Sequence, residues 1–485
     1  MSDKFIKKVL KQVTKFDKAI NTYTKIGKIP AIPYRAFVNM ADFMFLTGCI
    51  EQSEELLNNA INFVSQSSDA LVNLGFIKQT NKEYDKAIEY YKKALKKDRK
   101  NIKALCMWGN CLYAQNNIDN AIKKFEKAIE LDNKSGEAYL CLGIALLKKK
   151  KYHEAKENFE LATQYNPKDA RGLFMLASVE IELGLYDNAL EKLMFIVEST
   201  ENNFGAYHNI AYIYFKKKDY NKTVIFAMTA IRLAPFKLET YLLLGDTYLM
   251  LNMEKAALEV YKSAEQQNLK SLFLYLSWGT AYQNMKQYEN AIERFKQAIE
   301  TESDNINDEL YARMAECSLK LDNIDDAKNY AEKALDISKE NYMANEVLAD
   351  ILYSEHKYNE SLEKYSICLK NTKKKSEIYL KIAECYEKLE NFVLSNKNYE
   401  KSIEYNREHK QTLIKYIESL IKQNDFITAN KKLLTLEKAS NDELDILKLI
   451  YKVNINLPNN EYSRIKAQKT AEKIKKKYPD FVFEL

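Results

Sequence analysis

The chain has 485 residues, of which 11 are Gly, 6 are Pro and 29% are charged. So few Gly and Pro leave little material for the turns of a β-rich or α/β chain, and the composition therefore favours helices. The formal net charge is only +6, and only eight of the 74 basic residues are Arg, which argues against a nucleic-acid partner.

Small residues recur at a fixed interval along the chain. One column of Gly and Ala advances in steps of 34, with a single step of 36 between residues 279 and 315: Ala41, Gly75, Gly109, Gly143, Ala177, Ala211, Gly245, Gly279, Ala315, Ala349 and Ala383. A second column, twelve residues further on, is also small and includes Ala87, Ala121, Ala155, Ala189, Ala257 and Ala291. Self-similarity at such a period indicates a repeat array.

Each repeat reads as a pair of helices. We number positions so that the first small column is 8 and the second is 20; large residues then occupy position 24, among them Tyr91, Phe125, Phe159, Leu193, Tyr261, Phe295, Tyr365 and Tyr399. Spacings of three and four residues place such columns on one face of a helix. The pattern predicts a helix A near positions 2–14 and a helix B near positions 15–30, packed through the small residues at position 8.

Fourteen such units fit the chain in order, the first beginning near residue 1 and the last near residue 444. Residues 1–33 are predicted as an N-terminal diverged repeat or cap, because Lys7 occupies position 8. Residues 34–409 form the main array, and residues 410–477 form diverged repeats with Ile417 and Tyr451 at position 8. Residues 478–485 remain as a tail, so we expect no catalytic domain.

The repeat resembles that of the tetratricopeptide repeat superfamily, whose pattern is W-x2-L-G-x2-Y…A-x3-F…P. Unit 136–169 carries the resemblance best, with Tyr139, Leu142, Gly143, Leu146, Tyr152, Ala155, Phe159, Ala162 and Pro167. The resemblance implies an all-α, right-handed superhelical solenoid of about 12–14 helix-turn-helix repeats. It also implies that the A helices line a concave groove that binds peptides.

The residues that could carry chemistry are explained by the repeats. The 11 Gly lie at repeat positions or in turns, leaving none for a phosphate-binding loop. Cys111, Cys317 and Cys385 share position 10, where other repeats carry small apolar residues, and the four His are scattered over different units. We therefore expect no catalytic residue, no metal, no cofactor and no enzyme activity.

Helix A has a second face, made of positions 2, 5, 9, 12 and 13, that should be polar if it met only water. It carries candidate groove residues that are mostly apolar: Phe76, Asn110, Tyr113, Ile144, Phe174, His208, Tyr212 and Phe215. An exposed apolar face of this extent indicates a binding site. The alternative is that positions 5 and 12 are half-buried between neighbouring A helices.

Position 9 becomes acidic further along, at the candidate residues Glu316, Asp350, Glu384 and Glu418. These acids could receive Lys or Arg of a partner. Alternatively they are neutralised within their own helix, because Glu316–Lys320, Glu384–Lys388 and Glu418–Lys422 are four residues apart.

The leading hypothesis is a non-enzymatic scaffold that binds an extended protein segment, part apolar and part basic, in the groove. Because no apolar run is long enough for a membrane span and no signal peptide precedes the array, we expect a cytoplasmic protein without a membrane span. Three alternatives stay open: a regulatory subunit of an enzyme complex, an RNA-binding helical repeat, which would need a basic groove, and a membrane-surface role for a basic amphipathic helix at residues 3–25. The oligomeric state and the partner cannot be read from the sequence.

Overall fold

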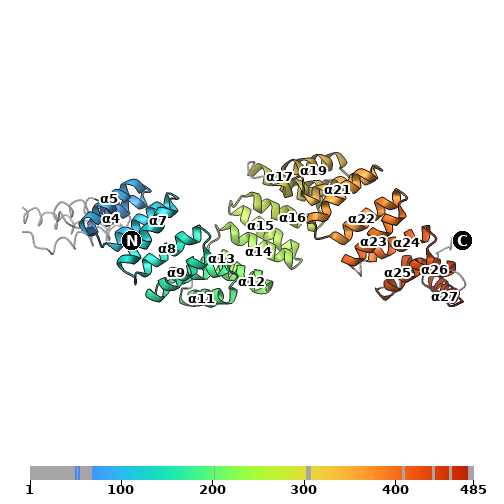
Figure 1. Ribbon diagram of the computed structural model, residues 1–485, viewed down its shortest axis with the longest axis horizontal. Helices are drawn as coiled ribbons and strands as arrows, with labels where there is room; N and C mark the ends of the chain where they lie inside the picture. Colours follow the sequence, from blue (N-terminus) through green and yellow to red (C-terminus); the bar gives the residue numbers. More distant parts are fainter. Residues whose placement is uncertain are drawn as a thin grey trace, which may run out of the picture. The chain divides into compact units, whose positions relative to one another are not determined.

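The computed structural model describes residues 50–51, 53–54, 68–200, 202–301, 307–406, 410–439, 443–457 and 461–478. The predicted cap at 1–33 and all of the tail but residue 478 lie outside these residues. Within them the chain forms helices and turns without a strand. The chain divides into two compact units, residues 1–234 and 235–485 (Figure 1).

The first unit contains five described helix pairs. They are α4 (Ser68–Thr80) with α5 (Tyr84–Lys97), α6 (Ile102–Ala114) with α7 (Ile118–Leu131), α8 (Gly136–Lys148) with α9 (Tyr152–Tyr165), α10 (Ala170–Glu182) with α11 (Tyr186–Ser199), and α12 (Phe204–Lys216) with α13 (Tyr220–Leu233). The even-numbered members are the predicted A helices and the odd-numbered members the B helices. Each A helix contacts its own B helix and the next A helix, so the pairs stack in chain order (Figure 1).

The second unit contains seven described helix pairs. They are α14 (Leu238–Met250) with α15 (Glu254–Gln266), α16 (Leu272–Asn284) with α17 (Tyr288–Thr301), α18 (Asp308–Lys320) with α19 (Ile324–Ile337), α20 (Tyr342–Ser354) with α21 (Tyr358–Asn371), α22 (Lys375–Lys388) with α23 (Phe392–Tyr405), α24 (Lys410–Lys422) with α25 (Phe426–Ala439), and α26 (Leu444–Asn456) with α27 (Glu461–Lys477). Each unit is thus an all-α solenoid, which confirms the predicted fold class. The sequence placed the start of helix B two residues early, because a turn occupies positions 14–16.

Position 8 is small because the ring at position 24 lies directly on it. A Cβ atom built on the five glycines of this column would lie 2.2–2.6 Å from the ring of Tyr91, Phe125, Phe159, Tyr261 or Phe295. These rings are at most 1% exposed. Carbon atoms do not approach this closely, so any side chain at the five glycines forces the ring or the helix to move.

A common turn joins A to B in the eleven pairs from α4–α5 to α24–α25. In repeat 136–169 the residue at position 15, Lys150, has a φ of 59°. Its N–H donates to the carbonyl of Leu147 at 2.9 Å, and the N–H of Lys151 donates to the carbonyl of Leu146 at 3.0 Å. This is the Schellman motif, which satisfies the last carbonyl groups of the A helix. Only one of the eleven position-15 residues is Gly, namely Gly184.

Candidate binding surface

In the first unit, the predicted groove residues lie on the A helices. Phe76 on α4 is the most exposed of them, at 37%, and the other seven are half-buried. Phe174 on α10 fits the alternative interpretation, because a Cβ built on Gly205 of the next A helix would lie 3.0 Å from its ring. Position 5 is therefore partly buried between neighbouring A helices, as that interpretation expects.

The remaining residues of this face have contacts on their inner side. Tyr113 and Ile144 pack against the buried cluster that contains Phe125 and Phe159, and Tyr212 packs against a second cluster. Phe215 and His208 contact aromatic neighbours. The ring centroids of Phe215 and Tyr220 are 5.8 Å apart in an edge-on arrangement, and those of His208 and Phe204 are 6.1 Å apart. The face is a half-exposed apolar stripe with its inner edge in the core.

In the second unit, four successive A helices border a hollow of about 560 Å³. Helices α16, α18, α20 and α22 supply most of its lining, including the predicted residues Glu316 and Asp350. Four acids and four bases line it: Glu316, Glu346, Asp350 and Glu377, with Arg313, Lys320, Lys374 and Lys381. The hollow is therefore close to neutral rather than acidic.

Asp350 is held by residues of its own repeat and of the next one. Lys381 on α22 places its Nζ 2.8 Å from Asp350 and 2.7 Å from Glu346. Burial opposes the charge on Lys381, but the two carboxylates outweigh it and raise the pKa of the amine above its usual value. The hydroxyl of Tyr365 donates to the same Asp350 oxygen at 2.5 Å. Asp350 thus has a structural role whether or not a partner binds.

Two other acids of position 9, Glu316 and Glu384, also find partners outside their own helix. Glu316 accepts from the side-chain amide of Gln283 at 2.8 Å, and that amide's oxygen accepts from Arg313 at 3.2 Å. Glu384 pairs closely with Lys415 of the next repeat. Lys422 pairs with Glu387 at 2.7 Å, and not with Glu418.

Internal neutralisation is therefore present, but none of the three pairs expected four residues apart forms an ion pair in the described helices, although Glu418 helps to raise the pKa of Lys422. In two cases the bonding base is at position 6 of the following repeat, 31 residues after the acid: Lys381 after Asp350, and Lys415 after Glu384. These bonds join α20 to α22 and α22 to α24, so a 31-residue spacing brings side chains of successive A helices together. Bases at position 6 were the signal that sequence reasoning missed.

Sequence reasoning also missed the acceptors for the tyrosines of position 24. Each ring is buried, and each hydroxyl reaches an oxygen on the A helix of its own repeat: Tyr91 to Gln79, Tyr261 to Asp246, Tyr365 to Asp350 and Tyr399 to Glu387. Repeats with Phe at position 24 need no such acceptor. Carboxylates on this face therefore also serve the core.

The pKa values of two of these acceptors, Asp246 and Glu387, are shifted in opposite directions. Burial raises the pKa of Asp246 above its ordinary value, although hydrogen bonds from Tyr261 and Ser277 oppose this. Burial also disfavours the charge on Glu387, but hydrogen bonds from Lys422 and Tyr399 outweigh it and leave its pKa below the ordinary value. A nearby ammonium group makes the difference between them.

Chemistry-bearing residues do not gather elsewhere in the described part of the chain. No three His, Cys, Asp or Glu side chains there lie close enough to hold a metal ion. The six described cysteines are free and buried, and burial raises the pKa of the Cys106 thiol to about 12. None of the described helices is long and apolar enough to cross a bilayer.

Family profiles match several of the repeats. Profiles described as tetratricopeptide repeat match residues 68–101, 136–169, 204–237 and 284–344, and one described as TPR repeat matches residues 109–150. No curated protein matches the chain.

Several solved structures align with this chain. The Cut9–Hcn1 hetero-tetramer of the APC/C aligns at 10% identity with a TM-score of 0.44, over 92% of this chain and 98% of that one. PilF of Pseudomonas aeruginosa aligns at 24% identity with a TM-score of 0.39, over 43% and 94%. YrrB, described as a TPR protein with an unusual peptide-binding site, aligns at 22% identity with a TM-score of 0.33, over 38% and 95%.

Proposed function

The chain belongs to the tetratricopeptide repeat superfamily, and from this premise we propose that it is a non-enzymatic scaffold that binds an extended segment of a partner protein. Repeats of this family commonly serve protein interaction, because a stack of helix pairs presents one long surface. The binding surface is the A-helix face. The hollow of the second unit carries the proposal, since it runs over four successive A helices.

The partner segment proposed for this hollow carries both signs of charge. Because four acids face four bases, a purely basic segment would gain little, and the partner's charges must be arranged to complement this mixture. The absence of a basic excess also favours a protein over RNA, whose phosphates would need one. The apolar stripe of the first unit supplies a second contact surface, on Phe76, Ile144 and Tyr212, for apolar side chains of the partner.

The first test reverses two exposed charges in the hollow, Lys320→Glu together with Glu377→Lys. Both side chains are exposed, so folding should be unaffected. The partner is first captured by affinity purification and identified by mass spectrometry. Its affinity for the variant should fall at least several-fold at low salt, with a smaller loss at high salt.

The matched control is the double variant Glu293→Lys with Lys296→Glu on α17. It makes the same reversal on exposed residues outside the hollow, and it should bind the partner like the wild type. Equal affinity of both double variants would exclude the hollow as the binding site. Recovery of RNA instead of protein in the capture would exclude the proposed class of partner.

A triple variant addresses the apolar stripe: Phe76→Ala, Ile144→Ala and Tyr212→Ala. If the stripe contacts the partner, affinity should fall by a similar factor at low and high salt, since apolar contacts are not screened. The unfolding midpoint of the free variant must be measured beside it, because Ile144 and Tyr212 also pack against the core. Wild-type affinity at both salt concentrations would make the stripe purely structural.

A further inference from the structure

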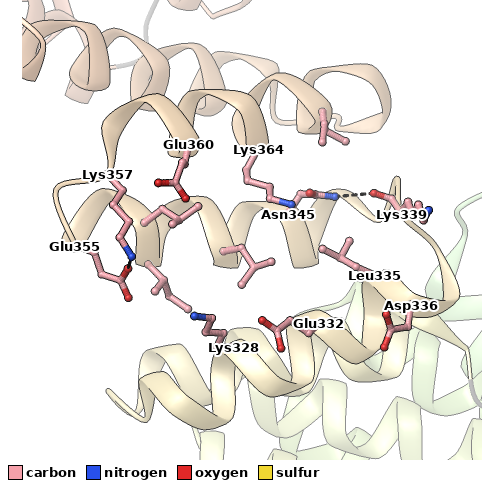
Figure 2. A pocket seen from close by; sticks show the side chains of 14 residues that line it. Lys328, Glu332, Leu335, Asp336, Lys339, Asn345, Glu355, Lys357, Glu360 and Lys364 are labelled. Carbon is pink, nitrogen blue, oxygen red and sulfur yellow. Dashed lines mark hydrogen bonds and ion pairs between the residues drawn. The ribbon is translucent and has the colours of Figure 1, made fainter.

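A cleft of about 620 Å³ lies between helices α19, α20 and α21. Figure 2 shows its two walls, with Lys328, Glu332, Leu335 and Asp336 on α19 and Glu360 and Lys364 on α21. Its apolar lining is Leu335, Leu348, Ile351, Leu352 and Ile367. The cleft shares no lining residue with the A-helix hollow, so it would be a separate site.

The cleft lies where one repeat departs from the others. Position 4 holds a large residue in the other eleven repeats from residue 68 onward, namely Leu71, Leu105, Tyr139, Leu173, Tyr207, Tyr241, Tyr275, Tyr311, Tyr379, Leu413 and Leu447. In repeat 342–375 it is Asn345. A side chain this short leaves unfilled the volume that a phenol ring or a leucine takes in the neighbouring repeats.

Asn345 forms one of the hydrogen bonds that a tyrosine at position 4 forms in other repeats. Its Nδ2 donates to the carbonyl of Lys339, six residues earlier, at 3.1 Å and to that of Asn341 at 2.8 Å. The hydroxyls of Tyr139 and Tyr241 donate to carbonyls six residues earlier in the same way, at 3.3 and 3.1 Å. These two bonds fix the amide so that its oxygen is the free end.

That oxygen has no donor among the described residues. Asn345 is 0% exposed, and its Oδ1 is one of the few buried side-chain oxygens without a hydrogen bond. A buried carbonyl without a donor is unfavourable, so a ligand that supplies an N–H or O–H is favoured there. Figure 2 shows the half-buried Lys364 side chain reaching toward Asn345 across the cleft, so this flexible chain must move aside before a ligand can enter.

We propose that this cleft receives one aromatic side chain with a hydrogen-bond donor, the indole of Trp or the phenol of Tyr, from a partner protein. The ring occupies the space left at position 4, against Leu335, Leu348 and Ile367, and its N–H or O–H donates to Asn345 Oδ1. The displaced ammonium of Lys364 can then lie over the ring face. Charged side chains of both signs at the rim suit the polar backbone and mixed flanking residues of a polypeptide.

The test uses the full chain with labelled Leu and Ile methyl groups and three probes. Indole should shift the methyl signals of Leu335, Leu348 and Ile367 in a saturable way. N-methylindole, which lacks the donor, should bind about tenfold more weakly. N-acetyltryptophanamide, which presents the ring on a peptide backbone, should bind at least as well as indole.

Each probe can overturn a different part of the proposal. Equal binding of indole and N-methylindole would remove the role of the Asn345 oxygen. Binding of indole without binding of N-acetyltryptophanamide would restrict the cleft to small molecules and exclude a partner side chain. No methyl shift with any probe would show that the cleft does not open.

Variants at residue 345 provide the structural control. Asn345→Tyr fills the space as in the neighbouring repeats and should abolish the indole shifts, and Asn345→Leu, the other residue found at this position, should do the same if the tyrosine variant folds poorly. Asn345→Ala keeps the space but removes the acceptor, so indole and N-methylindole should bind it equally. Unchanged indole binding in both filled variants would place the probe elsewhere.

Discussion

The A helices of the two units have the same buried face, which carries position 8, but their opposite faces differ. In both units, glycine at position 8 lies under an aromatic ring at position 24, as in the pairs Gly143–Phe159 and Gly279–Phe295. On the opposite face, the first unit presents an apolar stripe and the second presents ion pairs that cross from one repeat to the next. The buried positions 8, 20 and 24 therefore determine the repeat. The exposed positions of helix A are free to differ and can specify partners.

The largest effect is expected from substitutions on the buried face that both units share. Gly143→Leu and Gly279→Leu should each destabilise the protein by about 1–3 kcal/mol, because the added side chain overlaps a buried ring. Hydrogen exchange should show the loss first in the altered repeat and its neighbours, since a solenoid couples mainly adjacent pairs. A large loss of stability in one unit and none in the other would show that the two units do not share this packing. Uniform loss of amide protection over the whole chain would show that stability is not local to adjacent pairs.

An intermediate effect tests the ion pairs that distinguish the second unit. Lys381→Met leaves Asp350 and Glu346 without their shared base, and we expect a loss of about 1–2 kcal/mol in denaturant unfolding. Lys320→Met, at an exposed position in the same hollow, is the control and should change stability by less than about 0.5 kcal/mol. Similar values for the two variants would mean that the cross-repeat pairs add nothing to stability.

The sequence predicted the buried face well because that face depends on residue size at fixed spacing. Gly143 and Phe159 are 16 residues apart in one helix pair, so a periodic pattern is enough to join them. Asp350 and Lys381 belong to different repeats, and their contact depends on how neighbouring A helices align. The unfilled space at Asn345 was missed for another reason: a single departure at position 4 has no meaning until the walls around it are known.

The smallest effect concerns pH and compares two acceptors of tyrosine hydroxyls. Because the pKa of Asp246 is raised from 3.8, the folded protein holds this proton more tightly than the unfolded chain does, so its contribution to stability falls as pH rises above about 4. The pKa of Glu387 is lowered from 4.5, so its contribution is present above that pH and is lost as pH falls below it.

Asp246→Asn and Glu387→Gln should therefore respond to pH in opposite directions. Relative to the wild type, Asp246→Asn should become more favourable between pH 3 and pH 7, and Glu387→Gln less favourable. We expect each change to stay below about 1 kcal/mol, because both groups are partly exposed. Denaturant midpoints at several pH values measure it, and parallel curves for the two variants would show that Lys422 does not distinguish the two sites.

The A-to-B turns have a consequence for how this protein can evolve. Ten of the eleven position-15 residues are not Gly although all have positive φ, among them Lys82, Lys150, Lys218 and Lys286. The Schellman hydrogen bonds impose this backbone on whatever residue is present, at a steric cost of about 1 kcal/mol. These positions lie outside both the buried positions 8, 20 and 24 and the A-helix face, so changes between Lys, Asn and Gly there can adjust heat resistance repeat by repeat. Substitutions at position 15 can thus change thermal stability without changing which partner the A-helix face binds.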